Sequence, residues 1–593
     1  MPTGVQVLNL MDTEVSVGEI HLGLRHLTNL AAINLSDTAI EYTYDPGWSF
    51  FSSHPHLRHV DVSACLSLMQ NNTGPAILQH REEFFADLCS NRELRWVNVS
   101  CLPLDGRCLR LLLELPHADF LGLFNTNVLE EELRTDIEIG ASFTLEQLLT
   151  ALRQLGTSSV RVVRELLRSL FDRLTPSAAA EPTVDIDADN GLTALVVTSL
   201  EHFDSDYGIQ IVTTAALYYL TSDRIKGQVP AVRLHVLEVL LDLLERLSEN
   251  QHSPVQVVKN CCLTLRNFHP EDELARYSCR VAISLLRAAL IFDDRTIQTS
   301  AILMCCHNLA SLHPHHKERI GSVGPQGGIE LVLELIQRQH AELEPNVEEP
   351  LFSILELCWT FMWNITDETP SNVARFLDND GLTVLLQSLE KFPAVITLRR
   401  NAMGLVTNIA EVPLYRGSLV TERMMKELKS CLELENSNLE VTYNVAGTLC
   451  HVMAEGDAYW AAHELSYELR RALLDRIAEV VGNWCQATER WINYRSVKPI
   501  IGLLRPELET EIHLWASWAL LSLCTVNPEK YCDMCRAEGA LEAMKTLVLR
   551  ADTSEAVRMQ TQEAFERCTT FEAHREELAA DALVPMELTE SEE

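Results

Sequence analysis

Two kinds of internal repeat follow one another in this sequence, and they restrict the fold more strongly than any other feature. Near the N-terminus, a pattern of two apolar residues around one central residue recurs five times, at intervals of 24 to 37 residues. The copies are Leu8–Leu10, Ile33–Leu35, Val60–Val62, Val97–Val99 and Leu121–Leu123. In leucine-rich repeats, each repeat has one short strand followed by a connecting segment of variable length that leads back to the next strand. We therefore expect leucine-rich repeats over residues 1–135.

Residues on either side of these strands support the same interpretation. Leucines precede three strands by three positions, and serines follow them where the chain must turn: Leu30, Leu57 and Leu94, then Ser36, Ser63 and Ser100. The first copy has no polar repeat before it, although the end of a repeat stack normally needs one. This predicts that the chain starts inside its natural domain.

The periodicity changes to that of helices near residue 143. Residues 136–189 are predicted to form a helical connector with the first armadillo-like helices, and they end in a soft break rich in Ala, Pro and Asp. Beyond this break, apolar helices each carry a polar residue near the helix end. These residues recur at intervals of 41 to 56, as Asn267, Asn308, Asn364, Asn408 and His451.

Glycines mark the expected starts of further helices, because a flexible residue permits the tight turn into a new repeat. They are Gly191, Gly327, Gly328, Gly381 and Gly539. The repeat interval and these glycines together predict armadillo-like repeats with a peptide-binding groove over residues 190–575. An insertion is expected at residues 484–496 and an acidic tail at residues 576–593. The predicted fold class is thus α/β leucine-rich repeats followed by an all-α armadillo-like superhelix, which is a solenoid.

The charge of the chain limits its partners. With 84 acidic and 48 basic residues, the formal net charge is -36, which disfavours nucleic acid and anionic membranes and suits cationic or amine-bearing partners. Neither a secretory signal nor an apolar stretch of about 20 residues is found, so we expect a soluble protein of the cytoplasm or the nucleus. The 17 cysteines are interpreted as free core thiols.

Sequence motifs of enzymes and metal sites are missing. The sequence contains no glycine-rich phosphate loop, nucleophile elbow or His-x-x-x-His helix, so we expect a non-catalytic protein without a cofactor. Cys532 and Cys535 have the spacing of half a zinc site, but no second Cys or His pair lies near them in the sequence, and no metal is expected. The segment His313–Lys317 is interpreted as a solvated turn rather than a metal site.

The most informative residues lie on two successive helical repeats. Trp363, Asn364 and Asp367 occupy positions i, i+1 and i+4 near one helix end, and Asn408 and Glu411 stand three apart on the next repeat. Adjacent helices pack roughly 10 Å apart, so we expect both carboxylates to approach one patch of the groove.

Two carboxylates at close range repel each other unless a cation lies between them. A free α-ammonium group supplies that charge with three hydrogen-bond donors, and the Trp363 indole beside it would restrict the first side chain to glycine. The alternative stays open that the carboxylates are solvated and the asparagines bind a neighbouring carbonyl.

Several segments resemble one known family over nearly the whole chain. MWNITDETP, TNIAEVP, YNVAGTLCH, WINYRS, HLWASWAL and NPEKYC are similar to the C-terminal armadillo region of the Zyg-eleven and Zer-one family, and more so to its Zyg-eleven branch. The order of leucine-rich repeats before armadillo repeats agrees with that family. Its members are substrate receptors of cullin-2 RING ubiquitin ligases.

The resemblance implies a function and a set of contacts. It implies binding of proteins that begin with free glycine, the Gly/N-degron, through Trp363, Asn364, Asp367, Asn408 and Glu411, and their ubiquitin-dependent degradation. It also implies partnership with cullin-2 and elongins B and C, although the family's docking box is not evident here. On the following repeat, Asn444 and His451 are further candidate contacts to the peptide.

A second function remains open from the residues alone. An armadillo adaptor of the importin or catenin kind holds extended basic peptides along a groove of asparagine and acidic residues. Such an adaptor would bind internal Lys/Arg-rich segments as well as chain ends, and this property distinguishes the two hypotheses.

Overall fold

The computed structural model forms two compact units, residues 1–274 and 275–593. The structure describes residues 4–16, 23–41, 49–65, 75–133, 136–175, 191–222, 229–268, 273–274, 276–322, 327–344, 353–433, 438–485 and 494–582. The soft break at residues 176–189 and most of the predicted insertion lie outside these ranges. No helix in the described ranges is long and apolar enough to cross a membrane.

The first unit begins with a six-stranded parallel sheet whose strands lie in chain order. They are β1 (Val7–Asn9), β3 (Ala32–Asn34), β5 (His59–Asp61), β6 (Trp96–Asn98), β7 (Phe120–Gly122) and β8 (Glu138–Gly140). The five predicted strands are confirmed, each beginning one residue earlier than expected, and their central apolar residues pair in register. A second sheet pairs β2 (Glu14–Ser16) with β4 (Ala39–Glu41) in parallel.

Strand β8 corrects the prediction that residues 136–189 are a helical connector. It pairs with β7, Leu121 opposite Ile139, and so extends the sheet beyond residue 135. The sequence pattern missed it because Ile139 is flanked by Glu138 and Gly140, and the strand carries only one apolar side chain.

The buried side of this sheet explains the recurring leucines and serines. Leu30, Leu57 and Leu94 are fully buried. The last residue of a strand accepts the backbone N–H two residues later, at 2.9, 2.9 and 3.1 Å in the pairs Asn34–Ser36, Asp61–Ser63 and Asn98–Ser100. These local bonds turn the chain inward after each strand, which fits the predicted leucine-rich repeats.

Helices complete the first unit. Among the described residues, α3 (Pro75–Ser90), α4 (Gly106–Leu113) and the short η1 (Glu130–Glu132) lie between strands. The helices that follow the sheet are α5 (Leu145–Leu155), α6 (Val160–Leu174), α7 (Leu192–His202), α8 (Tyr207–Leu220), α9 (Pro230–Leu247) and α10 (Val255–Leu265). The Thr144 and Gln147 side chains form a capping box at the start of α5, which places the change from strand to helix at the predicted point.

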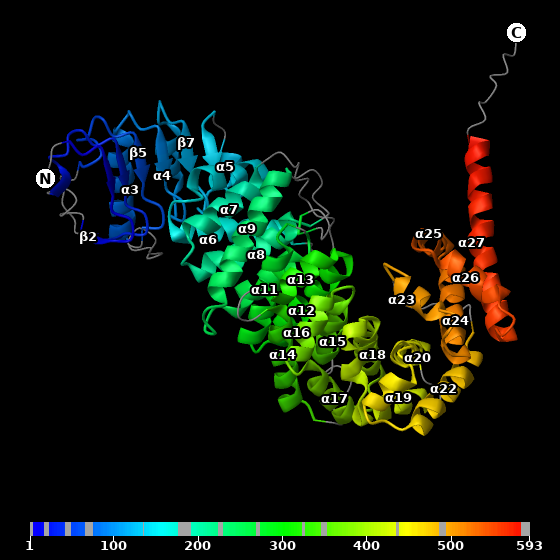
Figure 1. The fold of residues 1–593 in the computed structure, drawn as a ribbon. Helices are drawn as coiled ribbons and strands as arrows, with labels where there is room; N and C mark the ends of the chain where they lie inside the picture. The colour runs from blue at the N-terminus through cyan, green and yellow to red at the C-terminus, as the bar shows by residue number, and fades with distance from the viewer. Residues whose placement is uncertain are drawn as a thin grey trace, which may run out of the picture. The chain divides into compact units, whose positions relative to one another are not determined.

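The second unit is a stack of armadillo-like helical repeats. One row of long helices runs through it (Figure 1), each packed against the next: α12 (Arg295–Ser311), α15 (Ser353–Thr366), α18 (Ile396–Glu411), α20 (Leu439–Met453), α24 (Thr510–Val526) and α27 (Glu555–Ala582). We call these the row helices. The helices α15, α18, α20 and α24 bury most of their residues, which explains their largely apolar sequences.

The other described helices of the second unit precede the row helices or connect them along the chain. They are α11 (Ser278–Ile291), α13 (Pro314–Ser322), α14 (Gly328–Glu342), α16 (Pro370–Asp378), α17 (Gly381–Lys391), η3 (Pro413–Leu419), α19 (Glu422–Glu433), α21 (Asp457–Ala462), α22 (Tyr467–Gly482), α23 (Lys498–Ile501), η4 (Gly502–Leu504), α25 (Pro528–Glu538) and α26 (Ala540–Leu549). The predicted helical solenoid is therefore present.

The glycines expected at helix starts behave in two ways. Gly191 and Gly539 have φ of 64° and 90° directly before α7 and α26, as a tight turn requires. Before α17, however, the left-handed residue is Asp380, with φ of 56°. Gly381 is needed for space instead, because a Cβ atom there would lie 2.3 Å from the Phe376 ring.

Two further expectations from the sequence were wrong. The segment His313–Lys317 is not a turn, because α13 begins at Pro314 and buries Lys317 against the repeat stack. The predicted acidic tail begins too early, since α27 continues through residue 576 to Ala582; residues beyond it lie outside the described ranges. All 17 cysteines are free thiols, and all but Cys279 and Cys485 are buried, as expected.

Candidate functional site

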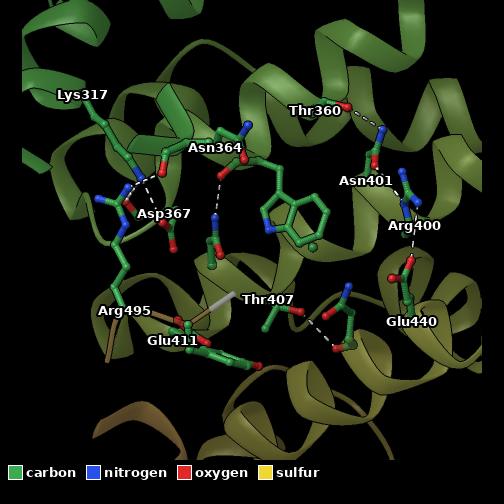
Figure 2. Close-up of a pocket in the computed structure, with 16 residues that line it drawn as sticks. Lys317, Thr360, Asn364, Asp367, Arg400, Asn401, Thr407, Glu411, Glu440 and Arg495 are labelled. Atoms are coloured by element: carbon green, nitrogen blue, oxygen red, sulfur yellow. Dashed lines mark hydrogen bonds and ion pairs between the residues drawn. The ribbon is translucent and has the colours of Figure 1, made fainter. Parts of the chain in front are cut away.

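A polar pocket of about 370 Å³ lies on the groove side of the row helices α15, α18 and α20 (Figure 2). Its walls come from four row helices, from α13 and from the segment before α23. They are lined by Ala310, Lys317, Thr360, Trp363, Asn364, Asp367, Arg400, Asn401, Gly404, Thr407, Asn408, Glu411, Glu440, Asn444, Tyr494 and Arg495. A concave site with several convergent polar groups is the usual form of a ligand-binding site.

The structure brings all five residues of the predicted patch to this pocket: Trp363, Asn364, Asp367, Asn408 and Glu411. The first two lie near the end of α15 and Asp367 follows its last residue, whereas Asn408 and Glu411 occupy the last turn of α18. Because α15 and α18 pack side by side, equivalent positions of successive repeats meet in the groove.

Asparagines join the row helices to one another at the pocket floor. Asn408 Nδ2 donates to the Trp363 carbonyl at 2.8 Å and to Thr366 Oγ1 at 3.0 Å. Two turns away, Asn401 Nδ2 donates to Thr360 Oγ1 at 2.8 Å and to the Glu356 carbonyl at 3.1 Å. These amides thus bind neighbouring carbonyls, as the alternative interpretation expected, and they fix the spacing of the helices that carry the carboxylates.

The position of the Trp363 indole depends on a glycine of the next repeat. A Cβ atom at Gly404 would lie 2.3 Å from the indole, which is closer than any real contact. The ring therefore lies directly over the α18 backbone and forms a flat apolar wall of the pocket. The sequence contains both residues, but only the packing of α15 on α18 shows that they touch.

A buried lysine binds the Asp367 carboxylate. Lys317 Nζ donates to Asp367 Oδ2 at 2.9 Å (Figure 2), and its side chain is only 1% exposed, against 39% for Asp367. Burial lowers the pKa of Lys317, and the neighbouring Asp367 opposes that shift. Among the described residues, none donates a hydrogen bond to Asp367 Oδ1, so one oxygen of an oriented carboxylate remains for a ligand.

The surroundings of Glu411 change the ionisation of its carboxyl group. Burial, followed by repulsion from Asp367 and Glu368, raises the pKa of Glu411 to about 8, while Arg416 partly opposes the shift. Its carboxyl group is therefore mostly protonated at neutral pH in the empty pocket. A cation placed between Asp367 and Glu411 would remove the repulsion and favour the ionised form.

Two arginines complete the walls. Arg400 pairs with Glu440 at 3.5 Å on the side of the pocket away from Asp367 (Figure 2). Arg495 donates to the carbonyls of Leu312, at 2.5 Å, and Ala310, so it reaches from the segment before α23 to the end of α12. This bridge closes one end of the pocket.

Of the two further peptide contacts expected on α20, one lies in the pocket and the other does not. Asn444 lines the pocket, is 2% exposed, and its Nδ2 has no hydrogen-bond partner among the described residues. His451 is not among the lining residues; it is buried with its ring 6.2 Å from Trp515. Burial and nearby Arg416 lower the pKa of His451 to about 3, so it is a neutral core residue rather than a groove contact.

Three cations that line the pocket were not predicted from the sequence: Lys317, Arg400 and Arg495. Lys317 was expected in a solvated turn, and no sequence signal marks Arg495, which is separated from Leu312 by 183 residues. Cys532 and Cys535 have no partners near them in the sequence, whereas α24 and α27 bring Cys524 and Cys568 to this region. Contacts between repeats several helices apart carry no local sequence pattern.

The fold and the site define a helical-repeat binding protein with a polar pocket in its groove. A family model described as the C-terminal domain of "Protein zer-1 homolog-like" matches residues 198–570. The chain belongs to the Zyg-eleven and Zer-one family. This confirms the family resemblance, while the assignment to the Zyg-eleven branch stays a prediction.

Individual relatives agree with this assignment. "Protein zer-1 homolog" of Mus musculus is 31% identical over 458 residues, 76% of this chain and 55% of that protein. "Zyg eleven-related protein 1" of Caenorhabditis elegans is 30% identical over 522 residues, 88% of this chain and 54% of that protein. The chain thus spans about half the length of these relatives. A designed armadillo repeat protein in complex with the peptide (KR)4 covers 49% of the chain at 16% identity, but its TM-score of 0.27 supports no conclusion.

Proposed function

We propose that this chain is the substrate-recognition part of a cullin-2 ubiquitin ligase and that its pocket binds the free N-terminal glycine of proteins to be degraded. In this role the chain is a receptor, and ubiquitin transfer is performed by partner subunits. The observation that carries the proposal is that Asp367 and Glu411 line one pocket, where repulsion from Asp367 contributes, after burial, to the raised pKa of Glu411. Two carboxyl groups that share a pocket can bind a cation.

An α-ammonium group fits the polar groups of this site. It offers three hydrogen-bond donors at the end of a chain. The pocket provides Asp367 Oδ1, the Glu411 carboxyl group and the side-chain amide oxygen of Asn408 as acceptors. The carbonyl group of the ligand's first residue could accept a hydrogen bond from Asn444 Nδ2, which has no partner among the described residues. One polypeptide terminus would thereby satisfy groups that otherwise remain without partners.

The closed end of the pocket favours a chain terminus over an internal segment. Arg495 bridges to the end of α12, so a peptide that reaches Asp367 cannot continue past it on that side. The flat indole of Trp363 leaves little room beside the ammonium group, which favours glycine as the first residue. Lys317, Arg400 and Arg495 disfavour basic residues, and this argues against the adaptor for extended basic peptides.

The ligase partners belong to the same proposal. Cullin-2 with elongins B and C is expected to join the receptor to the ubiquitin-transfer machinery, in the cytoplasm or the nucleus. Because the chain spans about half of its relatives, docking is tested apart from peptide binding, by co-purification with an elongin B, elongin C and cullin-2 complex.

Peptide binding is tested by titrating a fluorescent peptide with a free N-terminal glycine. Its acetylated form, its Met-preceded form and a peptide with internal Lys/Arg repeats serve as comparisons. We expect only the free glycine peptide to bind, and we expect Glu411→Ala with Asp367→Asn to remove binding. Equal binding of the acetylated peptide would exclude ammonium recognition, and preferential binding of the basic peptide would favour the adaptor.

A further inference from the structure

Four cysteine side chains converge at one point of the second unit, away from the pocket. Cys524 lies near the end of α24, Cys532 and Cys535 lie one turn apart on α25, and Cys568 lies on α27. All four are buried. Within the part of the chain that the structure describes, Cys524, Cys532 and Cys568 form the one group of at least three His, Cys, Asp or Glu side chains close enough to share an ion. Cys535 lies outside this group of three, but its Sγ atom is in contact with that of Cys524.

The shortest sulfur–sulfur separations are close to the edge length of a metal–thiolate tetrahedron. The Sγ atom of Cys524 lies 3.5 Å from that of Cys568 and 3.8 Å from that of Cys535, and the Sγ atoms of Cys524, Cys532 and Cys568 are all within 4.8 Å of one another. A tetrahedral zinc ion with bonds of about 2.3 Å has sulfur–sulfur edges of about 3.8 Å. A disulfide would require about 2.05 Å.

We propose that Cys524, Cys532, Cys535 and Cys568 bind one zinc ion, which joins α24, α25 and α27. Binding converts the four thiols to thiolates and releases up to four protons to solvent. The ligands are all thiolates and leave no open position, which is the pattern of a structural zinc site rather than a catalytic one.

The surroundings provide positive charge for this thiolate cluster. Arg536 donates to the Cys568 carbonyl at 3.2 Å, so its guanidinium group lies beside the cluster, although it also pairs with Asp533 at 3.0 Å. A nearby cation stabilises thiolates.

Such a metal would also fix the helix that supports the pocket wall. The Tyr531 hydroxyl on α25 accepts the Tyr494 N–H at 3.1 Å, and Glu538 at the end of α25 accepts the Val497 N–H at 2.7 Å. These bonds hold the segment that carries Arg495. The zinc proposal stands on the cysteines alone, whether or not the pocket binds a peptide.

The metal content of the purified full chain tests the proposal. Plasma mass spectrometry is expected to find about one zinc ion per chain after gel filtration without chelator. The double variant Cys524→Ser with Cys568→Ser is expected to lose it. The matched control, Cys261→Ser with Cys262→Ser on α10, also removes two buried thiols and is expected to keep its zinc. Equal zinc in both variants, or none in the unmodified chain, would overturn the proposal.

A second measurement needs no variant and therefore does not depend on variant folding. Zinc is removed with a chelator under reducing conditions, and cobalt(II) is added to the full chain. We expect thiolate-to-cobalt charge-transfer bands and the intense visible bands of tetrahedral cobalt. Their absence would show that the four thiols only pack against one another. Alkylation without reductant that leaves two cysteines protected until reduction would identify a disulfide and also refute the zinc site.

Discussion

Lys317 Nζ and Asp367 Oδ2 lie 2.9 Å apart, and the lysine is almost fully buried while the carboxylate faces the pocket. The lysine orients the carboxylate from behind. A ligand therefore meets a carboxylate that is already fixed, and it loses little entropy in ordering it.

Asp367→Asn should weaken the affinity for the peptide at least about tenfold, since it replaces the charged acceptor of the ligand's ammonium group by a neutral one. It should also lower the free energy of unfolding by about 1 kcal/mol, because Lys317 loses its counter-ion and water screens the more exposed partner. Urea unfolding and peptide titration measure the two effects. Asp378→Asn, on the exposed end of α16, is the control and should change neither.

Binding of the ammonium group should release a proton from Glu411. The pKa of Glu411 is raised to about 8 in the empty pocket, and a cation beside it favours the ionised form. Affinity should therefore rise with pH towards about 8 and fall above it, where the peptide's own amino group, with a pKa of about 8, loses its charge. Calorimetry in two buffers of different ionisation enthalpy measures the release, and Glu411→Gln should abolish it.

The same carboxyl group should make stability depend on pH. Because its pKa is higher in the folded protein than its ordinary value of 4.5, the folded state holds a proton that the unfolded chain has lost. The stabilisation is complete below about pH 4.5 and is lost as the pH rises to about 8. Glu411→Gln should flatten this part of the curve of unfolding free energy against pH; an unchanged curve would contradict the assignment.

Gly404→Ala should displace the Trp363 indole, since the added carbon would lie 2.3 Å from the ring. We expect a loss of about 1–3 kcal/mol in unfolding free energy and a weaker or absent peptide complex. Gly482→Ala is the matched control, because a Cβ atom there meets nothing within 4 Å. If both variants bind peptide like the unmodified chain, the indole is not a wall of the binding site.

Asn408 and Asn260 offer a comparison between equivalent bonds in different places. Asn260 Nδ2 donates to the Ile211 carbonyl and to Thr214 Oγ1, both at 3.1 Å, as Asn408 does to its own neighbours. Each change to alanine should cost about 1–3 kcal/mol in unfolding free energy. Only Asn408→Ala should weaken peptide binding. Equal effects on binding would mean that Asn408 acts through stability alone.

The sequence predicted those parts of the fold and site that repeat. The strands at Leu8, Ile33, Val60, Val97 and Leu121 could be located because each repeat has the same strand and turn. The residues of α15 and α18 could be paired for the same reason. A repeat pattern indicates that equivalent residues of successive repeats lie side by side. This is enough to predict that the carboxylates of Asp367 and Glu411 face the same groove.

Features that break the repeat could not be predicted in this way. Strand β8 has a single apolar residue, and Lys317 lies in a segment whose histidines and proline resemble a turn. His451 occupies the repeat position of Asn408, yet it faces Trp515 in the core. The four cysteines meet only because α24, α25 and α27 cross at one point, which no spacing along the chain records.

The contact between Arg495 and Leu312 spans 183 residues, and it bears on when the pocket comes into being. Bonds within and between neighbouring repeats form over short stretches of chain, whereas this one must wait until the helices between them are in place. The carboxylates would then be assembled early and the pocket closed late. A chain whose synthesis stopped before residue 494 could fold its first repeats and still lack Tyr494 and Arg495, so the proposed binding of a chain terminus would have to wait for the helices that follow α20.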